Sequence, residues 1–133
     1  MTVVGIRDAI KTALATITGL NTFDTVPESI NAFPAAFVFP RYGDYDYDVG
    51  DDMVHRFEIV VLVARQGDIA ESQDEIDAYC DASGTYSIKT AVDAATLSTH
   101  ADAIRVIRYR DYGSLDFAGS YYIGVRFDVD VIT

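Results

Sequence analysis

The densest run of side chains that could do chemistry lies at residues 41–52, where tyrosines and aspartates alternate. Asp44, Asp46 and Asp48 are spaced like the first ligands of a calcium-binding loop, in which every second residue supplies an oxygen. Such a loop also needs glycine at its sixth position and glutamate at its twelfth, and these positions hold Val49 and His55. A weak divalent-cation site therefore remains an alternative, but we expect no resident metal or cofactor.

The same tract has a second interpretation, as an extended arm or edge hairpin that contacts another protein. Exposed tyrosines are favoured at interfaces because they bring a large contact area at low entropic cost. Aspartates on a strand edge discourage unwanted strand pairing, and a plain solvated loop is the third interpretation. The candidate partner-facing residues are Tyr42, Asp44, Tyr45, Asp46, Tyr47, Asp48, Asp51 and Asp52.

The remaining reactive side chains do not form a catalytic set. His55 and His100 are far apart and lack a metal-binding spacing, so we expect surface or structural roles. Cys80, the only cysteine, is expected on the inner side of an acidic helix, where neighbouring carboxylates would raise the thiol pKa. No glycine-rich phosphate loop is present. These observations predict a protein that is not an enzyme.

The charge balance restricts the partners. The 133 residues contain 10 basic and 21 acidic side chains, which give a net charge of −11. Because nucleic acids and anionic membranes bind clustered lysine and arginine, this surface suits neither. Residues 66–84 hold six acids and no base, whereas Arg105, Arg108 and Arg110 follow one another closely. We expect these arginines to contact an acidic strip on another copy, with Glu71, Asp74 and Glu75 as candidates.

The hydrophobic pattern predicts the elements that position these residues. Apolar residues at three- and four-residue steps predict a helix from residue 3 to about 17, capped by Thr2 and stopped near Gly19. Helices are also expected at residues 69–82, ended by Gly84, and at residues 88–95, capped by Ser87. Expected strands cover residues 22–26, 35–39, 54–65, 103–112 and 120–132.

The residue patterns of two of these strands predict how the sheet is arranged and which of its faces are covered. The strand at residues 54–65 becomes apolar on both sides, which indicates a strand that is central in the sheet or covered on its second face. The last strand alternates strictly, and it should pair with residues 103–112 across a loop containing Gly113 and Gly119. We therefore expect a single α+β domain over residues 1–133, with a mostly antiparallel sheet flanked by an N-terminal helix and a central helix pair.

The order of elements resembles a known family. The segments that carry the resemblance are residues 2–10, 24–31, 34–36 and 77–89, of which Asp-Ala-Tyr-Cys-Asp-Ala-Ser-Gly at residues 77–84 is the strongest. They resemble the tail terminator proteins of bacteriophages with long non-contractile tails, especially those of actinobacterial hosts. The resemblance implies a homohexameric ring on the head-proximal end of the tail tube. Such a ring stops polymerisation of the tube protein and joins the tail to the head-completion proteins.

The resemblance also implies a location and partners. The protein would be made in the host cytoplasm and incorporated at the tail–head junction of the virion, with no membrane contact. DNA would pass through the ring without specific binding, and an acidic bore discourages its adhesion. The tract at residues 44–52 is our candidate for that bore. Two alternatives stay open: another neck component, such as a head-closure or head–tail connector protein, and a small divalent-metal-dependent enzyme using the carboxylates of the tract.

Overall fold

The computed structural model describes residues 2–23, 26–45, 53–65, 69–95 and 103–133. The elements in chain order are α1 (Val3–Leu14), β1 (Asn21–Phe23), β2 (Ala35–Asp44), β3 (Val54–Arg65), α2 (Ile69–Cys80), α3 (Ile88–Asp93), β4 (Ala103–Phe117) and β5 (Ser120–Ile132). The strands form one sheet in the order β1-β2-β3-β5-β4, in which only β1 and β2 pair in parallel. The expected α+β fold, with a mostly antiparallel sheet and three helices, is confirmed.

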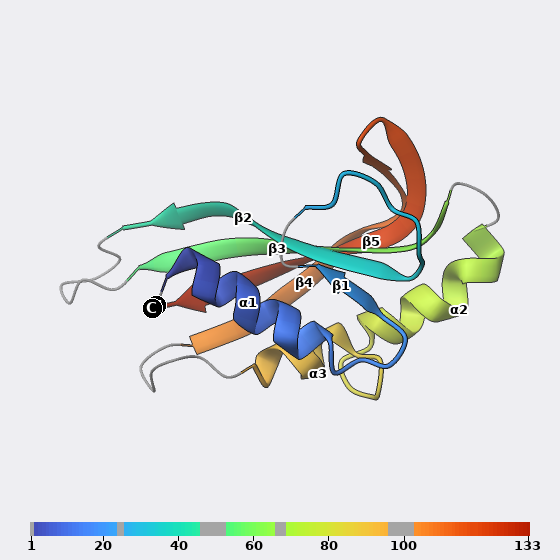
Figure 1. Cartoon of the computed structure of the whole chain (residues 1–133). Helices are drawn as coiled ribbons and strands as arrows, with labels where there is room; N and C mark the ends of the chain where they lie inside the picture. Colours follow the sequence, from blue (N-terminus) through green and yellow to red (C-terminus); the bar gives the residue numbers. More distant parts are fainter. Residues whose placement is uncertain (1, 24–25, 46–52, 66–68, 96–102) are drawn as a thin grey trace.

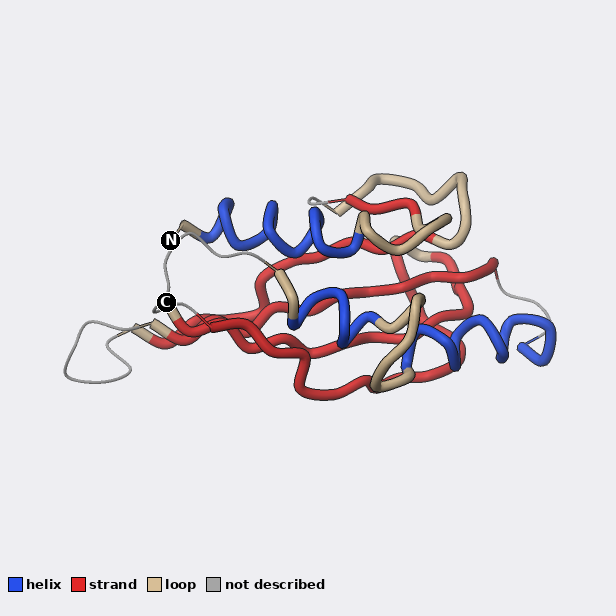
Figure 2. The backbone as a smooth tube through the Cα atoms, turned by 90° about the horizontal axis from the view of Figure 1, so that it is seen from below, coloured by secondary structure: helices blue, strands red, loops and turns tan. Residues whose placement is uncertain are grey.

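The helices lie on one side of the sheet, and the tip of the β4–β5 hairpin curls away from them (Figure 1). In the view from below, α3 and α2 are drawn over the strands, as expected for helices that cover one face of the sheet (Figure 2). The start of α1 and the C-terminus lie at the same end of the molecule, from which β2 and β3 project as an arm.

The main core fills the space between helices and sheet. Because side chains alternate along a strand, Phe57, Ile59 and Val61 of β3 face the helices together with the odd-numbered residues 123–131 of β5. From α1, the buried residues are Ile6, Ile10, Ala13 and Leu14. The expected helical stripe is therefore present, and burial of these side chains is the main stabilising contribution of α1.

The second face of β3 is also covered, as its sequence predicts. Val60 and Leu62 pack in a smaller core with Ile30, Phe37 and Tyr122, which come from the segment before β2, from β2 itself and from β5. This core occupies only one half of the second face. The other half of that face carries charged residues and is described below.

The first and third helices are capped by the residues that the sequence predicts, but the first two helices end earlier than predicted. The backbone N–H of Gly5 donates to the Thr2 hydroxyl at 3.0 Å, and that of Thr90 donates to the Ser87 hydroxyl at 3.1 Å. However, α1 ends at Leu14, and Gly19 (φ +83°) lies in the turn before β1. The helix expected at residues 69–82 ends at Cys80, so Gly84 lies in the turn before α3 and is not its capping residue.

Two strand boundaries differ from expectation, both because of β-bulges. β2 continues through Pro40 to Asp44, since a register shift between Pro40 and Tyr42 accommodates the residue that has no N–H. β4 continues to Phe117, and a shift between Arg110 and Gly113 places Gly113 (φ +130°) inside the strand. The hairpin turn is formed instead by Ala118 and Gly119, whose φ values of +53° and +81° suit a tight two-residue turn.

Gly124 is required by the close approach of β5 to β3. A Cβ at this position would lie 2.0 Å from the Val61 carbonyl oxygen, which is backbone and cannot rotate away. We expect Gly124→Ala to lower the free energy of unfolding by about 3 kcal/mol, as overpacking does in a tight core. Urea denaturation followed by circular dichroism measures this loss.

Gly43→Ala is the matched control for Gly124→Ala. Its added Cβ would meet the terminal methyl of Met53 at 2.5 Å, and this flexible side chain is able to move. We expect a change within about 1 kcal/mol of wild type. Equal losses for the two variants would show that the backbone contact at Gly124 is not the constraint.

Candidate functional site

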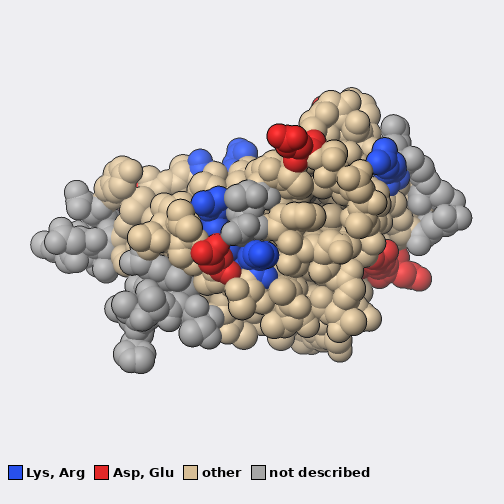
Figure 3. Space-filling view, viewed as in Figure 1, with Lys and Arg blue, Asp and Glu red and all other residues tan. Residues whose placement is uncertain are grey.

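The uncovered half of the second sheet face gathers most of the positive charge of the chain. By strand alternation and register, this face carries Arg56 and Glu58 of β3 and residues 126, 128 and 130 of β5. β4 adds Arg105, Arg108 and Arg110, and Arg41 reaches the same face from β2. Six of the eight arginines therefore lie on one face of an acidic protein. Figure 3, in the view of Figure 1, shows lysine and arginine side chains at several separate places on the side of the molecule that is seen there.

Two buried carboxylates organise this face. Glu58 is 1% exposed and Asp128 is 5% exposed. Arg110 donates from Nε to Asp128 Oδ1 at 3.1 Å and from its terminal nitrogen to Glu58. Arg108 adds a contact of 3.1 Å to Asp128, and Arg41 lies 3.9 Å from Glu58. Because arginines occupy the oxygens of both carboxylates, the cluster is suited to holding strands together rather than to proton transfer.

Arg110 is therefore a structural residue. Burial would by itself lower its pKa, but the hydrogen bond to Asp128 and the charges of Asp128, Glu58 and Asp111 raise the pKa overall. Its guanidinium stays charged, and it links β4 to β5 and β3. Of the three arginines expected to contact another copy, Arg110 and Arg108 are thus already paired within their own chain.

Arg105 has a different environment. It is exposed, and it forms no ion pair within the described part of the chain. β4 is an edge strand, and the exposed apolar side chains beside Arg105 are Ile107 and, on β5, Ile132. We call Arg105, Ile107 and Ile132 the β4 edge patch. A small hollow of about 220 Å³ lies within this area, lined in part by Arg105, Ile107 and Ile132.

The tip of the β2–β3 arm holds the described part of the tyrosine and aspartate tract. Tyr45 is 79% exposed, and Tyr42 lies with its ring centroid 5.9 Å from the guanidinium carbon of Arg56. Asp44 ends β2 and is exposed. The other candidates, Asp46, Tyr47, Asp48, Asp51 and Asp52, lie outside the described residues. Within the described ranges, no group of three or more metal-ligating side chains occurs, so the calcium alternative stays untested for most of the tract.

The acidic candidates of α2 and the β4 edge patch lie on different sides of the sheet. Asp74 and Glu75 are exposed on α2, and the side chain of Glu71 is outside the described set. α2 packs on the helix side through Ile76 and Tyr79, whereas Arg105 lies opposite Asp130 in the strand register, on the face that the helices leave uncovered. The opposite charges therefore lie at different places on one chain, and two copies arranged head to tail could bring them together.

The histidine and cysteine that sequence reasoning considered have structural environments. His55 is buried, its Nε2 lies 3.2 Å from the Thr133 hydroxyl, and burial lowers its pKa. His100 lies outside the described residues. The expected rise in the Cys80 pKa is confirmed: burial first, then the charges of Asp77 and Asp81, raise it to about 11.

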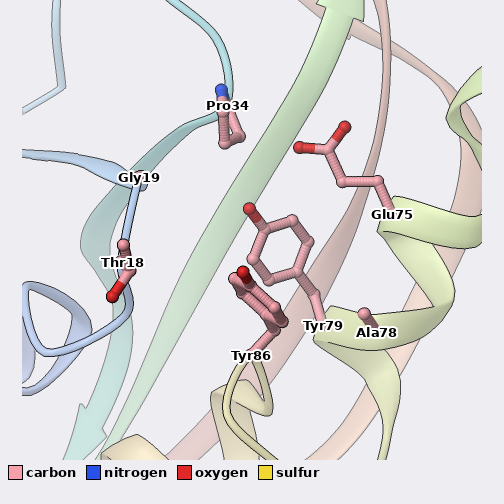
Figure 4. A pocket seen from close by; sticks show the side chains of 7 residues that line it. All are labelled: Thr18, Gly19, Pro34, Glu75, Ala78, Tyr79 and Tyr86. Atoms are coloured by element: carbon pink, nitrogen blue, oxygen red, sulfur yellow. The ribbon is translucent and has the colours of Figure 1, made fainter.

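The sequence analysis missed a pocket of about 340 Å³. It is lined by Thr18, Gly19, Pro34, Glu75, Ala78, Tyr79 and Tyr86. Figure 4 shows the two tyrosine rings side by side, with the Glu75 carboxylate next to them and Pro34 across the opening. These residues come from the turn after α1, the start of β2, α2 and the turn before α3. No local sequence signal unites segments so far apart along the chain.

Replacing Arg110 tests the buried network. In Arg110→Met, Glu58 and Asp128 lose their shared partner, so we expect the free energy of unfolding to fall by about 3 kcal/mol. Arg105→Met is the matched control, because it removes an exposed arginine from the same strand, and its effect should stay within about 0.5 kcal/mol. Urea denaturation at pH 7 compares them. Similar losses would contradict a structural role for Arg110.

The environment of Cys80 predicts slow thiol chemistry. With a pKa of about 11 instead of the ordinary 9.0, the thiolate fraction at pH 8 is about 100-fold smaller. We expect native protein to react with a disulfide reagent such as dithionitrobenzoate at least about 100-fold more slowly than protein unfolded in urea. Equal rates would show that burial does not protect the thiol.

Comparisons with known proteins leave the family open. No family model matches this chain, and no curated protein matches it. Within the described residues, no helix is both long enough and apolar enough to cross a membrane.

Proposed function

We propose that this protein is a structural component of a bacteriophage virion that forms a ring on the head-proximal end of the tail tube. As a tail terminator, it stops polymerisation of the tube protein and joins the tail to the head-completion proteins. The family resemblance of the sequence suggests this role. The observation that carries it is the separation of the β4 edge patch, with Arg105 on the uncovered sheet face, from the acidic helix α2 on the helix side of the same chain.

That separation suits a ring. Patches that are complementary but lie at different places on one protein pair head to tail, and a constant rotation at each contact closes a ring. β4 supports this use, since an edge strand is a ready contact surface when it has exposed apolar side chains and an arginine that forms no ion pair with any described residue. α3 covers part of that edge: the Val106 N–H donates to Asp93 at 2.8 Å, and Lys89 donates to the Val106 carbonyl at 3.2 Å. A contact between copies therefore uses side chains more than backbone pairing.

The arm provides a second surface for a different partner. The arm projects beyond the body of the sheet (Figure 1), and its Tyr42 and Tyr45 are exposed. Tyrosine is enriched in protein interfaces, and the tube protein and the head-completion proteins are the partners this role requires. The aspartates of the tract make the arm acidic, which lets DNA pass without adhesion if the arm faces the bore.

The runner-up is another neck component, a head-closure or head–tail connector protein. Such a protein would have the same need for a ring and an exposed arm, so the described surfaces favour neither role over the other. The two roles differ in the defect expected when the protein is absent. Loss of a terminator gives tails of the wrong length, whereas loss of a head-closure protein gives finished tails that do not join heads. A metal-dependent enzyme would need the tract carboxylates to gather around an ion.

Electron microscopy of phage lysates in which this gene is silenced tests the proposal. We expect overlong or ragged tail tubes beside filled heads, because nothing stops the tube from growing. Expression of the wild-type gene from a plasmid is the control and should restore tails of uniform length. Finished tails of normal length that do not join heads would instead indicate the head-closure role. Normal virions would contradict any structural role.

A further inference from the structure

The pocket beside α2 is lined mainly by aromatic and small side chains, although α2 itself is an acidic helix. The Tyr79 and Tyr86 rings meet edge to face, with centroids 6.3 Å apart and planes at 88°. Tyr79 is buried, whereas Tyr86 is 45% exposed, so part of its ring is accessible to a ligand. Pro34 and the turn at Thr18 and Gly19 complete the hollow from the side of α1 (Figure 4).

One carboxylate stands in this aromatic hollow. Burial raises the pKa of Glu75, and its hydrogen bond with Tyr79 partly offsets that rise. Burial and the charge of Glu75 raise the pKa of Tyr79 to about 12, so its hydroxyl stays protonated and donates to the carboxylate. No ion pair joins Glu75 to a basic side chain in the described part of the chain. The Glu75 side chain is exposed, so a cation that enters the pocket can reach its carboxylate directly.

The chemistry of the pocket favours a cationic guest. Tyrosine rings attract cations through their negative faces, and arginine also stacks its flat guanidinium on such rings. A carboxylate beside the rings accepts hydrogen bonds from the same group. An anionic ligand would be repelled by Glu75 and by Asp74 and Asp77 on the same helix.

The chain itself offers a matching cation on another surface. The other basic side chains are paired or less accessible. Ion pairs or hydrogen bonds within the chain involve Arg41, Arg56, Arg65, Lys89, Arg108, Arg110 and Arg126. Arg7 also interacts within the chain, and Lys11 is half-buried. Arg105 is exposed without such a partner in the described residues, and it stands beside exposed Ile107 and Ile132. Those aliphatic side chains would cover apolar surface around the pocket mouth once the arginine is inserted.

We propose that the pocket of Glu75, Tyr79 and Tyr86 receives the Arg105 side chain of a second copy of this chain. The contact is head to tail, because Arg105 lies on the sheet face that the helices leave uncovered, whereas the pocket lies on the helix side. This inference rests on the proposed function in that copies must associate. It adds the arginine and the pocket that form the contact.

Disulfide trapping between purified full-length variants tests the contact without any phage. In a Cys80→Ala background, untagged Thr18→Cys, at the edge of the pocket, is mixed at high concentration with tagged Ile107→Cys, beside Arg105, under mild oxidation, so that Glu75 and Arg105 both stay in place. We expect a mixed disulfide at least about tenfold faster than for the control pair of Thr12→Cys with tagged Ile107→Cys, because a bound pair raises the effective concentration. Thr12 is an exposed threonine on α1, so the control matches residue type and exposure. Equal rates, or no disulfide for either pair, would overturn the proposal.

Charge exchange during phage growth supplies the second measurement. Glu75→Arg and Arg105→Glu should each reduce complementation of the silenced gene at least about tenfold, and the double variant should recover most of it. Melting temperatures close to that of wild type exclude misfolding as the cause. If single variants complement fully while silencing disrupts tails, the pocket contact is wrong and the tail role stands. If silencing leaves virions normal while the disulfide forms quickly, the tail role is wrong and the contact stands.

Discussion

The pairing of Arg110 with two buried carboxylates is the constraint on which the charged face of the sheet depends. Glu58 on β3 and Asp128 on β5 are nearly inaccessible to solvent, and a lone buried charge costs several kcal/mol. Arg110 reaches both from β4, so the edge strand is tied to the centre of the sheet. With Arg108 also paired, Arg105 remains on that strand as an exposed arginine without an ion pair among the described residues. The internal network thus decides which arginine is available to a partner.

The fold was predictable from the sequence wherever the pattern of apolar and polar residues distinguishes the two faces of a strand. The alternation of β5 and the doubly apolar β3 predicted the helix side, the covered second face and the central place of β3 in the sheet. Thr2 and Ser87 predicted the helix starts because capping needs only a hydroxyl three residues before a free N–H. The expectations at Pro40 and Gly113 were wrong because bulges depend on how the neighbouring strand pairs, which one segment does not reveal.

The site was less predictable, because its contacts join distant residues. The sequence showed three arginines close together, but their partner Glu58 lies 52 residues away from Arg110 along the chain. Strand register decides that they meet, so a strip that looks available in the sequence is mostly occupied in the structure. The pocket beside α2 was hidden for the same reason, since its walls come from separate segments. What the sequence did predict was the segregation of acids and arginines between elements, and this is the feature that supports assembly between copies.

The most direct measurement of that assembly is an electron cryomicroscopy structure of the tail–head junction of the phage. Our account predicts one ring of this protein at the end of the tail tube, in which Arg105 of each copy enters the pocket of Glu75, Tyr79 and Tyr86 on the next. The arms of the ring would contact the tube, the head-completion proteins or the bore. A junction that lacks this protein, or a ring whose copies meet through other elements with the pocket empty, would contradict the account.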